Sequence, residues 1–108
     1  MTQAIEIPIA LDVPLYAERI TLDGVEYVFR FDWNERELRW YFDLGLPNGT
    51  WLVRGVKIVS DWPLLRRFKG ASFPKGHLIA IDLSDQGGEP PVFQDLGRRV
   101  KILYHPAA

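Results

Sequence analysis

Two histidines, His77 and His105, are the side chains of this sequence best suited to acid–base chemistry near neutral pH. Neither has a cluster of Asp, Glu or His near it at the spacing that metal ligands need. The chain also contains no cysteine, which excludes thiolate ligands and thiol nucleophiles. We interpret both histidines as surface or strand-end residues. The sequence therefore predicts neither a metal site nor a cofactor.

Several carboxylates lie close together in the sequence, and a pair of carboxylates is what a glycosidase uses. They fall in turns or on the polar faces of strands, where contact with water explains them. No serine stands in a G-x-S-x-G motif, and there is no phosphate-binding loop. We predict that the protein is not an enzyme and keep a hydrolase as a third hypothesis. The carboxylates are Asp32, Glu35, Glu37 and Asp43.

Two basic clusters stand near aromatic residues, a combination that binds single-stranded nucleic acid on some β-barrels. The clusters are Arg66-Arg67-Lys69, beside Phe68, and Arg98-Arg99-Lys101, close to Tyr104. A formal net charge of -1 argues against a polyanionic partner. The alternative hypothesis is a small β-barrel that binds single-stranded nucleic acid or carbohydrate through exposed rings.

Most aromatic residues alternate with polar ones, which places them on one face of a strand. A buried position explains these rings more simply than an exposed stacking platform does. Trp33 and Trp51 lie beside turns, so we expect both to be partly exposed. The residues predicted for the core are Tyr27, Phe29, Phe31, Trp40 and Phe42.

Turn signals divide the chain into short strands. Asp23-Gly24 predicts a tight hairpin turn between residues 17 and 33, and a further strand covers residues 37–44. In the strand expected at residues 51–59, the apolar residues change parity at Gly55, which indicates a bulge or bend. Further strands are predicted at 5–11, 77–83 and 100–104, with Pro8 placing the first of them at an edge.

The fold class that follows is all-β, with about seven strands in a small antiparallel β-barrel or β-sandwich. Asp61, Pro63 and the apolar spacing after them predict one short helical turn near residues 62–68. With 108 residues, the chain has room for a single domain, 1–108. Residues 1–15 lack the features of a signal peptide or membrane span, so we expect no membrane association.

The order of these segments resembles the small baseplate plug proteins of contractile-tailed phages. The similarity runs along nearly the whole chain, although each motif alone is only a turn followed by a strand. The residues that carry it are Leu22-Asp23-Gly24, W-N-E-R at 33–36, W-Y-F-D-L at 40–44, Asn48-Gly49, L-V-R-G-V-K-I-V at 52–59, Leu64-Leu65, Phe73-Pro74-Lys75-Gly76, H-L-I-A-I-D at 77–82, Leu96-Gly97 and V-K-I-L-Y at 100–104.

This resemblance implies a non-enzymatic virion structural protein of a contractile phage or prophage-derived tail. Such a plug lies at the centre of the baseplate and contacts hub and tail-tube proteins. It would be assembled in the host bacterial cytoplasm. By analogy with phage hubs, the resemblance also implies a homo-oligomer with threefold or sixfold symmetry in the tail. No catalytic residue is implied.

If the protein works through contacts, three surfaces are candidates for meeting partners. They are the N-terminal strand, the basic pair within the predicted helical turn, and the loop at residues 84–91, which has no apolar residue. The candidate contact residues are Ile5, Ile7, Ile9, Arg66, Arg67, Asp85 and Glu89.

Overall fold

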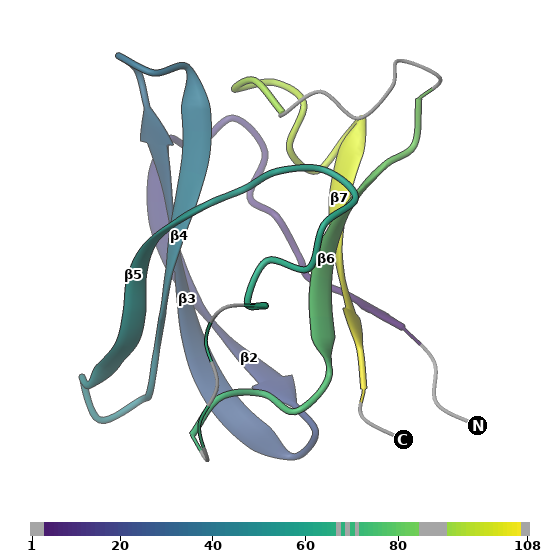
Figure 1. The fold of residues 1–108 in the computed structure, drawn as a ribbon. Coiled ribbons are helices and arrows are strands. Elements are labelled where there is room, and N and C mark those ends of the chain that lie inside the picture. Colours follow the sequence, from purple (N-terminus) through teal and green to yellow (C-terminus); the bar gives the residue numbers. More distant parts are fainter. Residues whose placement is uncertain (1–3, 67, 69, 71, 85–90, 107–108) are drawn as a thin grey trace.

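A computed structural model describes residues 4–66, 68, 70, 72–84 and 91–106. Among these residues, seven strands form two antiparallel sheets that face each other (Figure 1). One sheet has the order β2-β3-β4-β5 and the other the order β1-β7-β6. The strands are β1 (Ile5–Glu6), β2 (Leu15–Leu22), β3 (Val25–Asn34), β4 (Arg39–Gly45), β5 (Trp51–Lys57), β6 (His77–Asp82) and β7 (Val100–His105).

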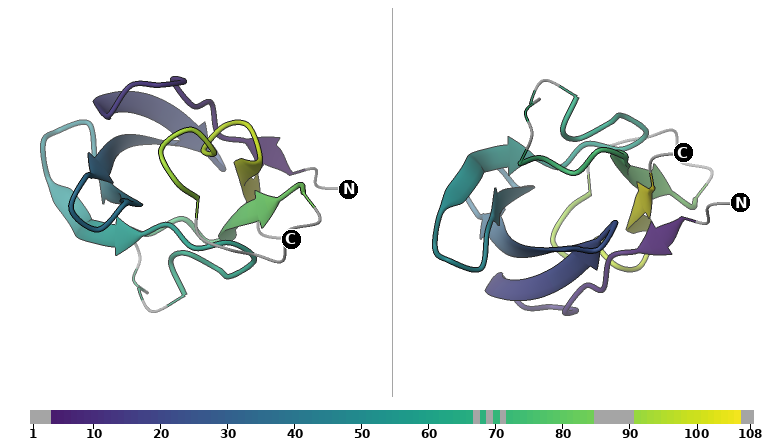
Figure 2. Two further views of the ribbon diagram at one scale, coloured as in Figure 1. Left: turned by 90° about the horizontal axis from the view of Figure 1, so that it is seen from above. Right: turned by 90° about the horizontal axis from the view of Figure 1, so that it is seen from below.

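The two sheets do not close into a barrel. No strand ladder joins one sheet to the other within the described residues, and the end-on views show two separate layers (Figure 2). The predicted all-β class is therefore confirmed, and of the two expected architectures the structure is a sandwich.

The hairpin of β2 and β3 forms where the sequence predicted it. Asp23 and Gly24 have φ angles of 52° and 79°, the pair of positive values that a type I′ turn needs. The two strands then pair without interruption from Leu22↔Val25 to Leu15↔Asp32.

The predicted irregularity in β5 is also present. Gly55 has a φ of 73°, and the pairing of β4 with β5 shifts register beside it. The Gly55 amide donates to Asp43 Oδ1 at 2.7 Å instead of to a ladder partner. The bulge changes which side chains face inward, so Val56 is buried after the exposed Arg54.

The hydrophobic core fills the space between the sheets. All five aromatic residues predicted for it are buried, with Trp40, Phe31 and Phe42 at most 1% exposed. Trp33 is half-buried and Trp51 is 36% exposed, as expected from their places beside turns. The large buried side chains are Trp40, Tyr104, Phe29, Phe31, Phe42, Ile7, Leu22, Leu44, Ile58, Leu96, Ile102 and Val100.

The segment near residues 62–68 forms turns, and no helix occurs among the residues described. The Leu64 amide donates to the Leu78 carbonyl of β6 at 2.8 Å, and Pro63 makes a bridge with Ile79. These contacts hold the start of the segment beside β6. Farther along, the Phe68 amide donates to the Leu65 carbonyl at 3.0 Å, which closes a single turn. Pairing with a strand thus replaces the expected helical geometry.

The N-terminal strand is shorter than the alternation at residues 5–11 indicated. β1 contains Ile5 and Glu6, and one further amide, that of Ile7, donates to the Ile102 carbonyl at 2.8 Å. Pro8 has no amide hydrogen to continue the ladder, so the chain leaves the sheet there and crosses toward β2.

Candidate functional site

The two histidines face each other across the outer end of a sheet and are both exposed. His77 of β6 pairs in register with His105 of β7. No group of three or more potential metal ligands occurs among the described residues. The pair therefore lies at a strand end, where the sequence placed it.

The four carboxylates noted in the sequence do come together, around a hollow of about 570 Å³ beside the β3–β4 turn. Asp43 lies 3.6 Å from Arg30 and 3.7 Å from Arg54, and Glu35 accepts a hydrogen bond from the Trp33 indole. These interactions engage Asp43 in salt bridges and Glu35 in a hydrogen bond at the surface.

Tyr41 belongs to the same hollow and donates its hydroxyl hydrogen to Glu37. This hydrogen bond raises the pKa of Tyr41 above its ordinary value, so the phenol stays protonated at neutral pH. A protonated phenol beside an engaged carboxylate supplies no free base. The arrangement therefore does not favour the hydrolase hypothesis.

The basic cluster at Arg98-Arg99-Lys101 is neutralised by carboxylates far away in the sequence. Arg98 makes two contacts of 3.0 Å with Asp12, and Lys101 lies 3.4 Å from Glu6. A cation already paired with a carboxylate is poorly placed to bind a phosphate. Sequence reasoning missed this pairing because the partners are 86 and 95 residues apart.

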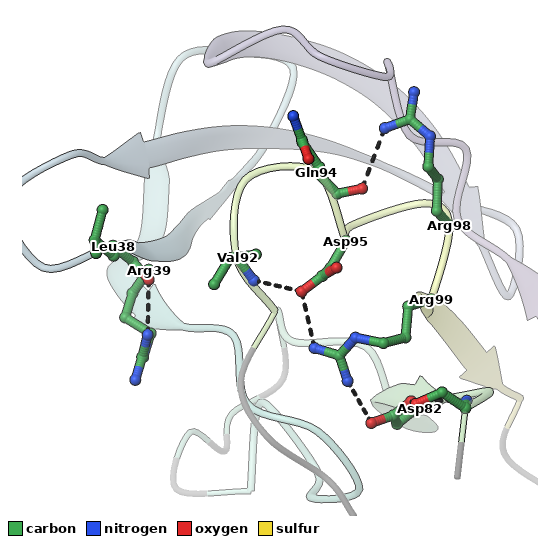
Figure 3. A network of polar contacts seen from close by, with 9 residues as sticks. Leu38, Arg39, Asp82, Val92, Gln94, Asp95, Arg98 and Arg99 are labelled. Atoms are coloured by element: carbon green, nitrogen blue, oxygen red, sulfur yellow. Dashed lines mark hydrogen bonds and ion pairs between the residues drawn. The ribbon is translucent and has the colours of Figure 1, made fainter. Parts of the chain in front are cut away.

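Arg99 lies at the centre of a largely buried polar network. It contacts Asp82 at the end of β6 at 2.5 Å and Asp95 in the turn before β7 at 2.9 Å (Figure 3). Asp95 also accepts the Val92 amide hydrogen at 2.9 Å. The network ties the turn at residues 92–98 to both long strands of the smaller sheet.

The Asp95 carboxyl is more acidic than an isolated one. Burial by itself would raise its pKa, but the hydrogen bonds from Arg99 and from the Val92 amide outweigh that effect and hold the pKa below its ordinary value. The carboxylate form is thus the one that the fold stabilises.

We expect the protein to lose stability in acid through this group. The folded-state pKa of Asp95 lies below the unfolded value of 3.8, so its contribution is present in full above that value and is lost as the pH falls through the folded pKa. Asp95→Asn should therefore flatten the acid side of a plot of unfolding free energy against pH, measured by urea denaturation. An unchanged acid slope in the variant would show that Asp95 makes no such contribution.

Three of the aromatic rings near the turns, those of Trp33, Trp40 and Phe93, pack on one another. Phe93 stacks on Trp40 at 5.7 Å between ring centroids and meets Trp33 edge-on at 5.5 Å. Phe93 thereby covers this end of the core, with Trp33 half-buried beside it. The alternative hypothesis of a nucleic-acid or sugar platform finds no support at these rings.

Arg66, one of the candidate contact residues, lies against an exposed tryptophan that the sequence did not single out as a contact. Trp62 is 52% exposed, and the Arg66 guanidinium lies over its ring at 4.9 Å from the centroid. Beside them is a hollow of about 540 Å³ lined in part by Phe68 and Phe73. Trp and Arg side chains are the types that most often dominate protein–protein interfaces. We call Trp62 and Arg66 the Trp–Arg pair.

The other candidate contact residues differ in how far their side chains are exposed. Ile5 is 40% exposed, whereas Ile9 is half-buried against the core. Ile7 is 0% exposed, so its side chain is part of the core and the expectation of a surface contact there is corrected. Ile5, Ile7 and Ile9 have the same parity in the strand, and the sequence alone does not show that the side chain at position 7 is the one that enters the core. Arg67, Asp85 and Glu89 lie outside the described residues.

A comparison with protein families decides the class of the protein. The family model described as cyanophage baseplate Pam3 plug gp18 matches residues 4–107. The chain belongs to this plug family. No curated protein matches it.

Membership in the plug family confirms the resemblance found in the sequence. It makes the chain a structural protein of the phage tail baseplate, with a location in the virion and association with other tail proteins. In the part of the chain that the structure describes, no helix is long and apolar enough to cross a membrane.

Proposed function

We propose that this plug-family protein acts without catalysis at the centre of the baseplate, where it contacts the hub and tail-tube proteins. The observation that carries the proposal is the family match, which extends over residues 4–107. The site geometry supports it, because the polar clusters described above are engaged in ion pairs and hydrogen bonds within the fold.

The proposal includes the finer features that the resemblance implies. Residues 1–108 act as one domain, the protein joins the tail as a threefold or sixfold ring of copies, and assembly takes place in the cytoplasm of the host bacterium. The gene belongs to a phage or a prophage. In a cyclic ring, every copy uses the same pair of surfaces to contact the copies on either side of it.

Deletion of the gene from the phage or prophage that encodes it tests this role. We expect the deletion to yield particles with defective tails, and we expect expression of the intact chain in the host to restore them. Normal, infectious tails in the absence of the chain would contradict a structural role at the baseplate centre.

The Trp–Arg pair is expected to contribute to the contacts with neighbouring proteins. Trp62→Ala should reduce incorporation of the chain into tails by about thirtyfold, since a buried interface tryptophan is often worth about 2 kcal/mol. The unfolding free energy should change little, because the side chain is 52% exposed. Quantitative mass spectrometry of purified tails measures the incorporation.

Arg36→Ala serves as the matched control and should leave incorporation unchanged. It changes an exposed residue in the turn between β3 and β4. Equal incorporation of Trp62→Ala and the unaltered chain would show that the Trp–Arg pair is not at an interface.

A further inference from the structure

Three of the four sheet edges are protected against pairing with another chain. β1 has two residues and is followed by Pro8. The outer side of β6 pairs with the preceding segment, where the Asp61 amide donates to the Ala80 carbonyl at 2.6 Å. β5 carries the bulge at Gly55, which turns an amide toward Asp43. Short strands, covered edges and bulges are the usual ways in which proteins block edge pairing.

β2 is the exception. It has eight residues in unbroken register with β3 and contains no proline, glycine or bulge. It forms one border of the larger sheet in both end-on views (Figure 2). A regular strand of this length at a sheet edge is a template for another strand.

One hydrogen bond shows which backbone groups of β2 point outward. The Trp33 amide donates to the Pro14 carbonyl at 2.8 Å, so positions 14 and 33 form a hydrogen-bonded pair. Because such pairs alternate along an antiparallel ladder, the even positions of β2 bond to β3 and the odd positions present their amides and carbonyls to the open side. No described residue makes a backbone hydrogen bond to that side of Leu15, Ala17, Arg19 and Thr21.

Glu18 lies in the middle of this edge with its side chain on the inward face. Its neighbours on that face, Tyr16 and Ile20, are half-buried and buried. Glu18 Oε1 is buried and has no hydrogen-bond partner among the described residues. Burial raises the pKa of Glu18, because it takes water away from the carboxylate.

We propose that the open edge of β2 receives an extended, antiparallel segment of another tail protein, and that this segment places a lysine or arginine opposite Glu18. The backbone groups of the odd positions would bond to the incoming strand. Glu18 would then occupy a non-hydrogen-bonded pair, the geometry that brings opposing side chains closest. A cation at that position would supply the missing partner for Glu18 Oε1.

A second copy of this chain fits the edge less well. Residues that oppose each other across an antiparallel pair share one face, and the inward face of β2 contains no cation. Pairing of β2 with itself would set Glu18 against Glu18 or against an uncharged side chain. On β5, the bulge at Gly55 interrupts the ladder that a second copy would offer. That the partner is a tail protein rests on the proposed function. That the edge of β2 is open to a strand rests on the structure alone.

Synthetic peptides test the edge directly on the full chain. The probe is an alternating Thr/Val peptide of about nine residues, enough to span β2, with lysine at its centre, and its twin has norleucine there. Chemical-shift changes in NMR spectra should be confined to β2 and the strand beside it. Exchange of the Ala17 and Arg19 amide hydrogens should slow. The lysine peptide should bind about tenfold more tightly than its twin.

Two variants separate the backbone contribution from the charge. Ala17→Pro removes an outward amide without touching the ladder to β3 and should abolish binding, whereas Ala17→Val, which keeps the amide, should preserve it. Glu18→Gln should bind both peptides equally, and Glu26→Gln on the outer face should keep the preference for lysine. Shift changes centred away from β2 and β3, or equal affinity of the two peptides for the unaltered chain, would overturn the proposal.

The same variants distinguish this proposal from the proposed function. Ala17→Pro should lower incorporation into tails relative to Ala17→Val. If both variants are incorporated equally, the β2 edge is not a docking site, although the baseplate role stands. If the unaltered chain is absent from tails, the baseplate role fails, and the peptide experiment still decides the property of the edge.

Discussion

Replacing Arg99 by methionine is expected to lower the free energy of unfolding by about 3 kcal/mol or more. The Asp82 side chain is 2% exposed and that of Arg99 is 19% exposed, so this ion pair is largely removed from water. Methionine fills a similar volume but leaves the Asp82 carboxylate without the Arg99 cation. The Ser84 amide and hydroxyl would still donate to Asp82, at 2.8 and 2.7 Å, but a buried carboxylate that has lost its counter-ion costs much more than the net value of the pair itself.

The neighbouring arginine provides a matched control for this prediction. Arg98 also pairs with an aspartate, Asp12, but the two side chains are 45% and 54% exposed. Arg98→Met should therefore cost less than about 1 kcal/mol. Urea denaturation of the two variants at neutral pH gives the comparison, and equal losses would contradict the view that Arg99 stabilises the smaller sheet through burial.

Replacing Gly76 by alanine is expected to have an effect of similar size, for a steric reason. A Cβ atom at this position would lie 2.1 Å from the His105 carbonyl oxygen and 2.7 Å from Tyr104 Oη. The Gly76 amide also donates to Tyr104 Oη at 2.7 Å. Since the nearest clash is with backbone, β6 and β7 would have to separate at this end. We expect a loss of about 3 kcal/mol in unfolding free energy.

Gly49→Ala is the control for the Gly76 variant. Nothing lies within 4 Å of a Cβ at Gly49, but its φ of 93° disfavours any other residue. That change should cost about 1 kcal/mol from backbone strain alone. Thermal or urea unfolding that ranks Gly49→Ala as the more damaging change would show that the close approach of β7 to Gly76 is not maintained in solution.

The region around Gly76 is sensitive because Tyr104 joins distant parts of the fold. Its hydroxyl donates to Asp23 in the β2–β3 turn and accepts the Gly76 amide hydrogen. Burial, followed by the hydrogen bond to Asp23, raises the pKa of Tyr104 to about 12. The phenol therefore remains protonated at every pH where the protein is expected to work, and it links the two sheets as a neutral group.

Features that depend on a few adjacent residues could be predicted from the sequence. Asp23-Gly24 alone specifies the positive φ angles of its turn, and the change of apolar parity at Gly55 locates the bulge. The aromatic alternation from Tyr27 to Phe31 likewise identified the core. In each case the local pattern and the final fold favour the same conformation.

Features that depend on residues far apart in the chain could not be predicted. The spacing of Leu64, Leu65 and Phe68 suits a helical turn, but pairing with β6 prevents it. The basic cluster around Arg98 looked like a surface for polyanions, because its partner Asp12 is 86 residues away. The unpaired Glu18 is similarly invisible in sequence, since the edge position of β2 is a property of the whole sheet.

An electron cryomicroscopy map of the tail from the phage or prophage that encodes this chain tests the central claim most directly. The account predicts density for this two-sheet sandwich at the centre of the baseplate, in contact with hub and tube proteins. A complete map of the baseplate in which no density fits the sandwich would contradict the account.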